Sequence, residues 1–127
     1  MKKYLLICIQ YYLFTGTVLL LSSCAYDTVV EPEPEIPEEV SFGLNVMPIF
    51  DAKCSTTGCH DQGGIPPVLT SDVAWSNLIN FNYVNTQDPP TSLLYEKIDE
   101  GGSMETFASN TDRAMILAWI EQGALDN

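Results

Sequence analysis

Two cysteines and a histidine lie close together near the middle of the chain. Cys54 and Cys59 are separated by four residues, and His60 follows the second cysteine directly. A cysteine pair that ends in Cys-His is the attachment signature of c-type haem, which usually has about two residues between the cysteines. In that chemistry both thiols add to the haem vinyl groups as thioethers, and the histidine binds the iron. The longer spacer consists of small residues that suit a loop, namely Ser55, Thr56, Thr57 and Gly58.

Two other chemistries could use the same residues. A disulfide between Cys54 and Cys59 would be ordinary in an exported protein, but it would close a short loop, add little stability and leave His60 unexplained. A zinc site would need a fourth ligand. Because His60 is the only histidine and the other two cysteines lie in the N-terminal segment, a carboxylate such as Asp61 would have to serve. The sequence favours haem, with a zinc-binding or disulfide-stapled interaction module as the alternative.

The first 23 residues predict a bacterial lipoprotein signal peptide. Lys2 and Lys3 form a basic start, and residues 4–21 are mostly apolar. The run Leu21-Ser22-Ser23-Cys24 then resembles a lipobox, whose cysteine is lipidated and becomes the first mature residue. The alternative is a membrane-spanning anchor, since about 18 apolar residues can just cross a bilayer. In either case we expect the remaining chain in the cell envelope, tethered to a membrane and facing the periplasm or the cell surface.

The rest of the chain divides into a tether and one small domain. Residues 24–41 are acidic and rich in proline, which predicts a disordered, solvated spacer. Residues 42–127 would form a single domain with a small core, and cores of that size need reinforcement. A covalent haem would provide a large apolar surface for side chains to pack on. We therefore expect the domain to be marginally stable without it.

Charge limits the possible partners. Removal of the signal peptide would leave three basic residues against 17 acidic ones, a formal charge of −14. Such a charge argues against nucleic acid and against an anionic membrane surface. It suits a redox partner with a basic docking face, and it would equally serve solubility alone. No catalytic constellation is evident, because there is no second histidine for a triad and no phosphate-binding loop, so we do not expect an enzyme.

The apolar pattern predicts an all-α domain of about four helices. Apolar residues recur at helical spacing, and no stretch sustains the alternation of a strand. The first helix would carry Val46, Ile49 and Phe50 and deliver Cys54. Residues 71–72 look like the cap of the second helix and residues 110–112 like the cap of the last, which Gly123 would stop. The expected buried residues of the later helices are Val73, Trp75, Leu78 and Ile79, then Leu93, Leu94, Tyr95 and Ile98, and finally Met115, Ile116, Trp119 and Ile120.

The order of these parts resembles the class I cytochrome c fold. More narrowly, it is similar to the small monohaem cytochrome c domains of bacterial, Bacteroidetes-like lipoproteins that have a lengthened haem-binding motif. The matching stretches are residues 46–50 with 54–61, residues 90–98, and residues 116–124, which end in Trp-Ile-Glu-Gln-Gly-Ala. The resemblance implies one covalent haem c, a role as single-electron carrier, and a crossing of the first and last helices near the haem edge. The residues implied at that crossing are Val46, Phe50, Ile116 and Trp119.

The resemblance also implies a second axial ligand to the iron. The family usually supplies a methionine from a loop just before the last helix, and Met104 matches by position. Met47 and Met115 are the alternatives, and core packing would explain both. If Met104 does not bind the iron, a haem sensor or accessory role becomes possible. For His60, we expect the second ring nitrogen to donate to a backbone carbonyl of residues 65–67, which would fix the ring.

Overall fold

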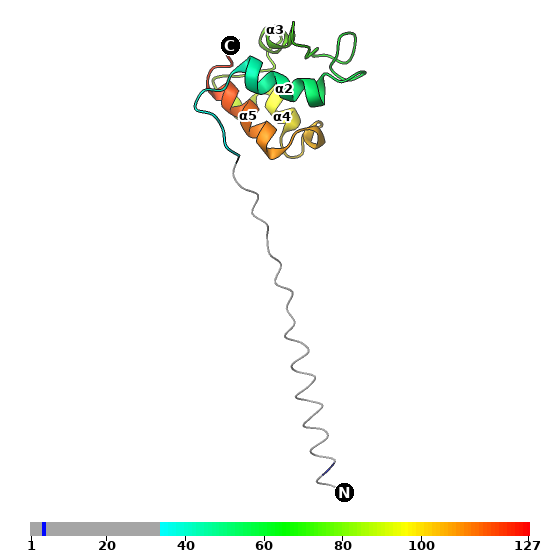
Figure 1. Ribbon diagram of the computed structural model, residues 1–127, viewed down its shortest axis with the longest axis vertical. Helices are drawn as coiled ribbons and strands as arrows, with labels where there is room; N and C mark the ends of the chain where they lie inside the picture. Colours follow the sequence, from blue (N-terminus) through cyan, green and yellow to red (C-terminus); the bar gives the residue numbers. More distant parts are fainter. Residues whose placement is uncertain (1–3, 5–33) are drawn as a thin grey trace. The chain divides into compact units, whose positions relative to one another are not determined.

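The computed structural model describes Tyr4 and residues 34–127, and residues 34–127 form an all-α domain without strands. Figure 1 shows how the helices gather around one core. This confirms the predicted helical class, whereas the signal peptide and Cys24 lie outside the described residues. The elements are η1 (Phe42–Val46), α2 (Met47–Ile49), η2 (Phe50–Cys54), α3 (Ala74–Asn80), η3 (Pro89–Thr91), α4 (Leu93–Ile98), η4 (Glu105–Phe107) and α5 (Asn110–Glu121).

The first helical segment begins earlier than its apolar pattern indicates. It starts at Phe42, where the Ser41 side chain caps the first turn. The end of the chain supplies two more acceptors: Asn127 Oδ1 accepts from the Phe42 amide at 2.9 Å, and the Asn127 carbonyl accepts from Gly43 at 2.9 Å. The first N–H groups of a helix need partners from outside it. Ser41 is a local partner, whereas the other two acceptors come from Asn127, more than 80 positions away, and no local pattern could have predicted those.

Wide turns flank Pro48 within this first segment. Proline has no N–H to donate, which interrupts regular helical bonding. On one side the Met47 amide bonds back to the Phe42 carbonyl. On the other, the Ser55 amide bonds to the Phe50 carbonyl at 2.7 Å, five residues back. Such wide turns occur frequently at functional sites, and the second of these ends at Cys54.

The start of α3 differs from the prediction. No side chain caps it; instead the Thr70 carbonyl accepts from the amides of Val73 and Ala74 at 3.0 and 2.8 Å. The Asp72 carboxylate accepts from the Thr70 hydroxyl rather than from the helix. The prediction of a cap at residues 71–72 was therefore wrong, because the turn closes through main-chain bonds. Leu78 is buried as expected.

The buried face of α4 is narrower than predicted. Leu94 and Ile98 are buried, but Leu93 is 40% exposed. Successive positions on a helix are turned by about 100° from each other, and in α4 it is Leu94 that faces the core. The Leu94 amide donates to the Tyr83 carbonyl at 2.9 Å, which fixes the entry of α4 and places Leu94 inward.

The last helix, α5, begins at Asn110, and its cap lies one residue before the predicted one. Ser109 is the N-cap, and Ser109 and Asp112 form a reciprocal capping box. At the other end Gly123, the predicted stop, adopts a φ of +99°. Its amide donates to the Ile120 carbonyl at 3.0 Å, so glycine accommodates the left-handed turn that ends the helix.

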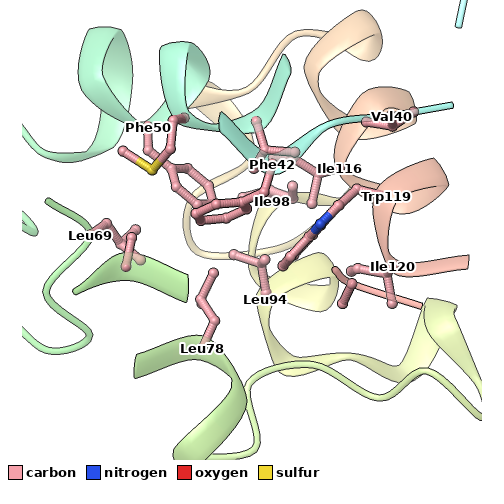
Figure 2. Packing of buried hydrophobic residues seen from close by; sticks show 14 of the residues in the cluster. Val40, Phe42, Phe50, Leu69, Leu78, Leu94, Ile98, Ile116, Trp119 and Ile120 are labelled. Carbon is pink, nitrogen blue, oxygen red and sulfur yellow. The ribbon is translucent and has the colours of Figure 1, made fainter. Parts of the chain in front are cut away.

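The core lies where α5 packs against η1 and α4. Figure 2 shows the Phe42 ring between Phe50 and Trp119, with ring centroids 6.2 Å and 5.0 Å away. Trp119 is completely buried, and its indole N–H donates to the Leu125 carbonyl at 3.0 Å. The first and last helical segments pack against each other, whereas their crossing at a haem edge stays a prediction. All four residues assigned to it belong to one buried cluster, namely Val46, Phe50, Ile116 and Trp119.

The packed domain begins before residue 42, which corrects the predicted end of the tether at residue 41. Val40 is 2% exposed and Ile36 packs partly against the core. The Val40 amide also donates to Gln122 Oε1 at 2.8 Å. The acidic and proline-rich composition of this stretch predicts a tether, so it did not indicate that Ile36 and Val40 pack in or against the core.

Candidate functional site

The site is built around Cys54, where the first helical segment ends. Phe50 lies one turn earlier, is 1% exposed and anchors this end of the segment in the core. The Cys54 side chain is half-buried and packs against the same core. The structure therefore holds Cys54 at a defined place on the edge of the core.

The four residues between the cysteines form a closed loop. The His60 amide donates to the Cys54 carbonyl at 3.0 Å, which brings the two ends of the motif together. Within the loop the Cys59 amide donates to the Thr56 carbonyl at 2.9 Å, and Gly58 has a φ of +85°. A glycine adopts that conformation without strain. The longer spacer is thus a compact turn that leaves Cys54, Cys59 and His60 close in space.

The His60 ring is fixed by two main-chain acceptors. Its Nδ1 lies 2.9 Å from the Ile65 carbonyl oxygen and 2.9 Å from the Pro67 carbonyl oxygen. Because both partners are acceptors, Nδ1 carries the proton. In the neutral ring Nε2 then keeps its lone pair, which is the form that binds a metal. The prediction that residues 65–67 would orient this ring is confirmed.

The segment after His60 folds back onto the motif and supports it. The Ile65 amide donates to the Cys59 carbonyl at 2.6 Å, and the Leu69 amide donates to the His60 carbonyl at 2.8 Å. A Cβ atom at Gly64 would collide with the Cys59 carbonyl oxygen, so only glycine allows this close return. Leu69 is 3% exposed and joins the core. The loop that orients His60 is therefore itself anchored.

An ion pair lies beside the first cysteine. Lys53 Nζ pairs with Asp112 Oδ2 of the α5 capping box. Burial is the main cause of a raised pKa of the Cys54 thiol, and the negative charge of Asp112 raises it further, against Lys53, which lowers it. Burial also tends to raise the pKa of Asp112, but hydrogen bonds from Lys53 and Ser109 outweigh it, and that pKa is lowered. Cys54 is accordingly a neutral thiol at pH 7, next to a charged pair.

Met104 lies on a separate segment, directly before η4. Its side chain is half-buried and packs against the core that also contacts Cys54. Its amide donates to the Lys97 carbonyl at 2.7 Å, which ties its backbone to the end of α4. A Cβ atom at Gly102 would collide with the carbonyl oxygens of Glu96 and Lys97, so glycine permits this close contact too. The loop that carries Met104 is thus held firmly against α4.

The two alternative methionines lie within helical segments. Met47 is 6% exposed and belongs to the buried cluster. Met115 is half-buried on α5 and packs against the same cluster. Both positions agree with core packing, as expected.

Two observations describe the site with respect to the disulfide and zinc alternatives. Cys54 and Cys59 are both free thiols. Across the described part of the chain, no three His, Cys, Asp or Glu side chains are grouped so that they could hold a metal ion. A zinc cage of Cys54, Cys59, His60 and Asp61 is therefore not assembled. Haem needs only the histidine nitrogen from this loop for its iron, because the cysteines bond to the porphyrin.

Sequence reasoning missed two contacts that surround the site. The Lys53–Asp112 pair joins positions 59 residues apart. Arg113 Nη2 donates to the main-chain carbonyl of Glu105, next to Met104, at 3.2 Å. A basic residue directly before Cys54 and an acidic residue directly after Met104 were the only signals, and charges at such positions are usually no more than solvated side chains.

Comparison with known proteins gives no match: no protein-family model, no curated protein and no solved structure is similar to this chain. Among residues 34–127 and Tyr4, no helix has the length and apolar character needed to cross a bilayer. The candidate lipidation site, Cys24, lies in the segment outside the described residues.

Proposed function

We propose that this protein is a membrane-tethered monohaem c-type cytochrome that transfers single electrons in the cell envelope. The observation that carries the proposal is the state of His60. Its Nδ1 is committed to two carbonyl oxygens, so Nε2 is available for a metal, within a closed loop that also presents two free cysteines. A histidine with a purely structural role would have no reason to lie in the same loop as two free thiols.

The residues fit haem c in the following way. Cys54 and Cys59 would form the thioethers, His60 would bind the iron through Nε2, and Met104 would be the second axial ligand. Haem bound in this way supplies reversible one-electron chemistry. The all-α fold, with α5 packed against η1 and α4, supports a cytochrome c-like domain. Two protein ligands would leave the iron no open position, which suits an electron carrier rather than an enzyme.

Charge and anchoring suggest where the protein works. The excess of acidic residues suits a redox partner whose docking face is basic, because complementary charge speeds encounter. Electron-transfer contacts are small and brief, so a large apolar interface is not required. Lipidation at Cys24 would hold the domain at a membrane. One acyl chain alone gives marginal binding, whereas two or more anchor a protein stably.

The test is the visible spectrum and intact mass of protein made in a host with c-type maturation machinery. We expect a red product heavier than the polypeptide by one haem, which survives acid–acetone extraction. Cys54→Ser and Cys59→Ser should each leave one thioether or none. Thr57→Ala changes an exposed residue of the same loop and should leave attachment intact. A colourless product of unmodified mass would refute the proposal, and a high-spin haem protein would point to the sensor alternative.

A further inference from the structure

Besides its main-chain bond to α4, the loop that carries Met104 is contacted by one side chain of α5, that of Arg113. Arg113 Nη2 donates to the Glu105 main-chain carbonyl at 3.2 Å and lies 3.9 Å from Glu105 Oε1. The other carboxylate oxygen, Oε2, accepts from the Gly101 amide at 2.9 Å. The two ends of this loop are Gly101 and Glu105. Arg113 contacts Glu105 directly, and the Glu105 carboxylate in turn binds the Gly101 amide.

Arg113 is more than a surface charge. Its side chain is only 13% exposed, against 40% for Glu105. In the described part of the chain, its Nε is buried without a hydrogen-bond partner. Burying a guanidinium costs free energy that its bonds must offset. The hydrogen bond and the ion pair of the Arg113 side chain both go to Glu105. Displacement of the loop would therefore remove both contacts from the buried guanidinium.

Asp112, the residue before Arg113 in α5, makes a similar contact with the segment that carries Cys54. Asp112 pairs with Lys53, which directly precedes Cys54. Two consecutive residues in the first turn of α5 thus hold the neighbours of Cys54 and of Met104. A helix is rigid over one turn, so this arrangement fixes the two segments relative to each other.

We propose that Arg113 is a positioning residue that holds Met104 where its thioether binds the haem iron, while Asp112 does the same for the segment of Cys54. This inference rests on the proposed function. It adds that the second axial bond depends on a charged contact outside the haem-binding motif. Loss of the contact should loosen the loop and weaken the bond without affecting haem attachment, since both cysteines and His60 lie elsewhere.

The experiment compares Arg113→Gln with wild type as matured protein. Haem content is measured first and should stay at one per chain. We expect the weak near-infrared band of iron–methionine ligation to fall to less than half of its wild-type amplitude, and carbon monoxide to bind to a correspondingly larger fraction. Amide hydrogen exchange at Gly101 and Met104 should become at least ten-fold faster. This last readout follows the loop itself and does not depend on the haem spectrum.

Three further variants make the result specific. Lys97→Gln removes the same charge from an exposed side chain of α4 and should change neither the band nor the exchange rates. Arg113→Lys keeps the charge and should restore part of the band. Glu105→Gln keeps the main-chain acceptor and should produce a smaller shift in the same direction, which covers the case in which Arg113→Gln does not fold.

The outcomes separate this inference from the proposed function. A wild-type protein without haem would refute the proposed function. Wild type with haem and the near-infrared band, but with Arg113→Gln and Glu105→Gln unchanged in band and in exchange within two-fold, would refute only the role of Arg113. Wild type with haem but without the band would overturn this role too, because there would be no iron–methionine bond to position.

Discussion

Trp119 is the residue on which the crossing of the first and last helices depends most. It is completely buried, its ring centroid lies 5.0 Å from that of Phe42, and its indole N–H donates to the Leu125 carbonyl. Truncation to alanine should cost about 3–5 kcal/mol through lost burial and a cavity. A domain of this size has on the order of 5–10 kcal/mol of stability, so Trp119→Ala should leave about 0–7 kcal/mol.

Trp119→Phe is the more informative change, because it keeps an aromatic ring beside Phe42. It removes the hydrogen bond to Leu125, worth about 1 kcal/mol, and part of the buried ring. We expect a loss of about 1–2 kcal/mol in the free energy of unfolding, which corresponds to a fall in Tm of roughly 4–16 °C. Urea unfolding of the matured protein, followed by circular dichroism, measures this loss.

Trp75→Phe is the matched control. The Trp75 indole also donates to a carbonyl of the C-terminal segment, that of Ala124 at 2.9 Å, but Trp75 is only half-buried. Its loss should be about half as large, since less apolar area leaves the core. Equal losses for the two variants, or a Trp119→Ala protein as stable as wild type, would refute the central place of Trp119 in the core.

Three other perturbations test separate parts of the account. Met104→Ala should abolish the near-infrared band, lower the reduction potential and allow carbon monoxide to bind, whereas Met47→Ala should cost about 2–5 kcal/mol of stability and keep the band. Cys24→Ala should release the domain from membranes or block processing; a processed, membrane-bound variant would contradict lipidation. The pKa of Asp112 is lowered in the folded state, so its pairing with Lys53 stabilises fully above its ordinary pKa of about 3.9 and is lost as pH falls below it. Asp112→Asn should therefore be less stable at pH 6 and lose less stability between pH 5 and pH 2; an unchanged acid limb in urea titrations would contradict this.

The sequence predicted those features that local chemistry determines. The helical class and the stop at Gly123 follow from spacing and residue type, whereas the four packed residues of the first and last helices were implied by the resemblance. The orientation of His60 could also be predicted, because a metal-binding histidine usually donates its second ring N–H to a carbonyl, and residues 65–67 offer carbonyls nearby.

The remaining features depend on contacts between distant residues. The start of the first segment uses Asn127, and the cysteine-bearing end is tied to α5 through Lys53 and Asp112. Neither contact leaves a periodic trace in the sequence. The burial of Val40 could not be predicted for another reason. An isolated apolar residue within an acidic stretch does not distinguish a packed segment from a solvated tether.

The most direct test of the account is tandem mass spectrometry of the proteolytic peptide that contains Cys54, Cys59 and His60, taken from protein matured in the envelope of a competent host. We predict that this peptide carries one haem, bonded through both cysteine sulfurs. A peptide with two unmodified thiols, or with a Cys54–Cys59 disulfide, would contradict the assignment of a c-type cytochrome.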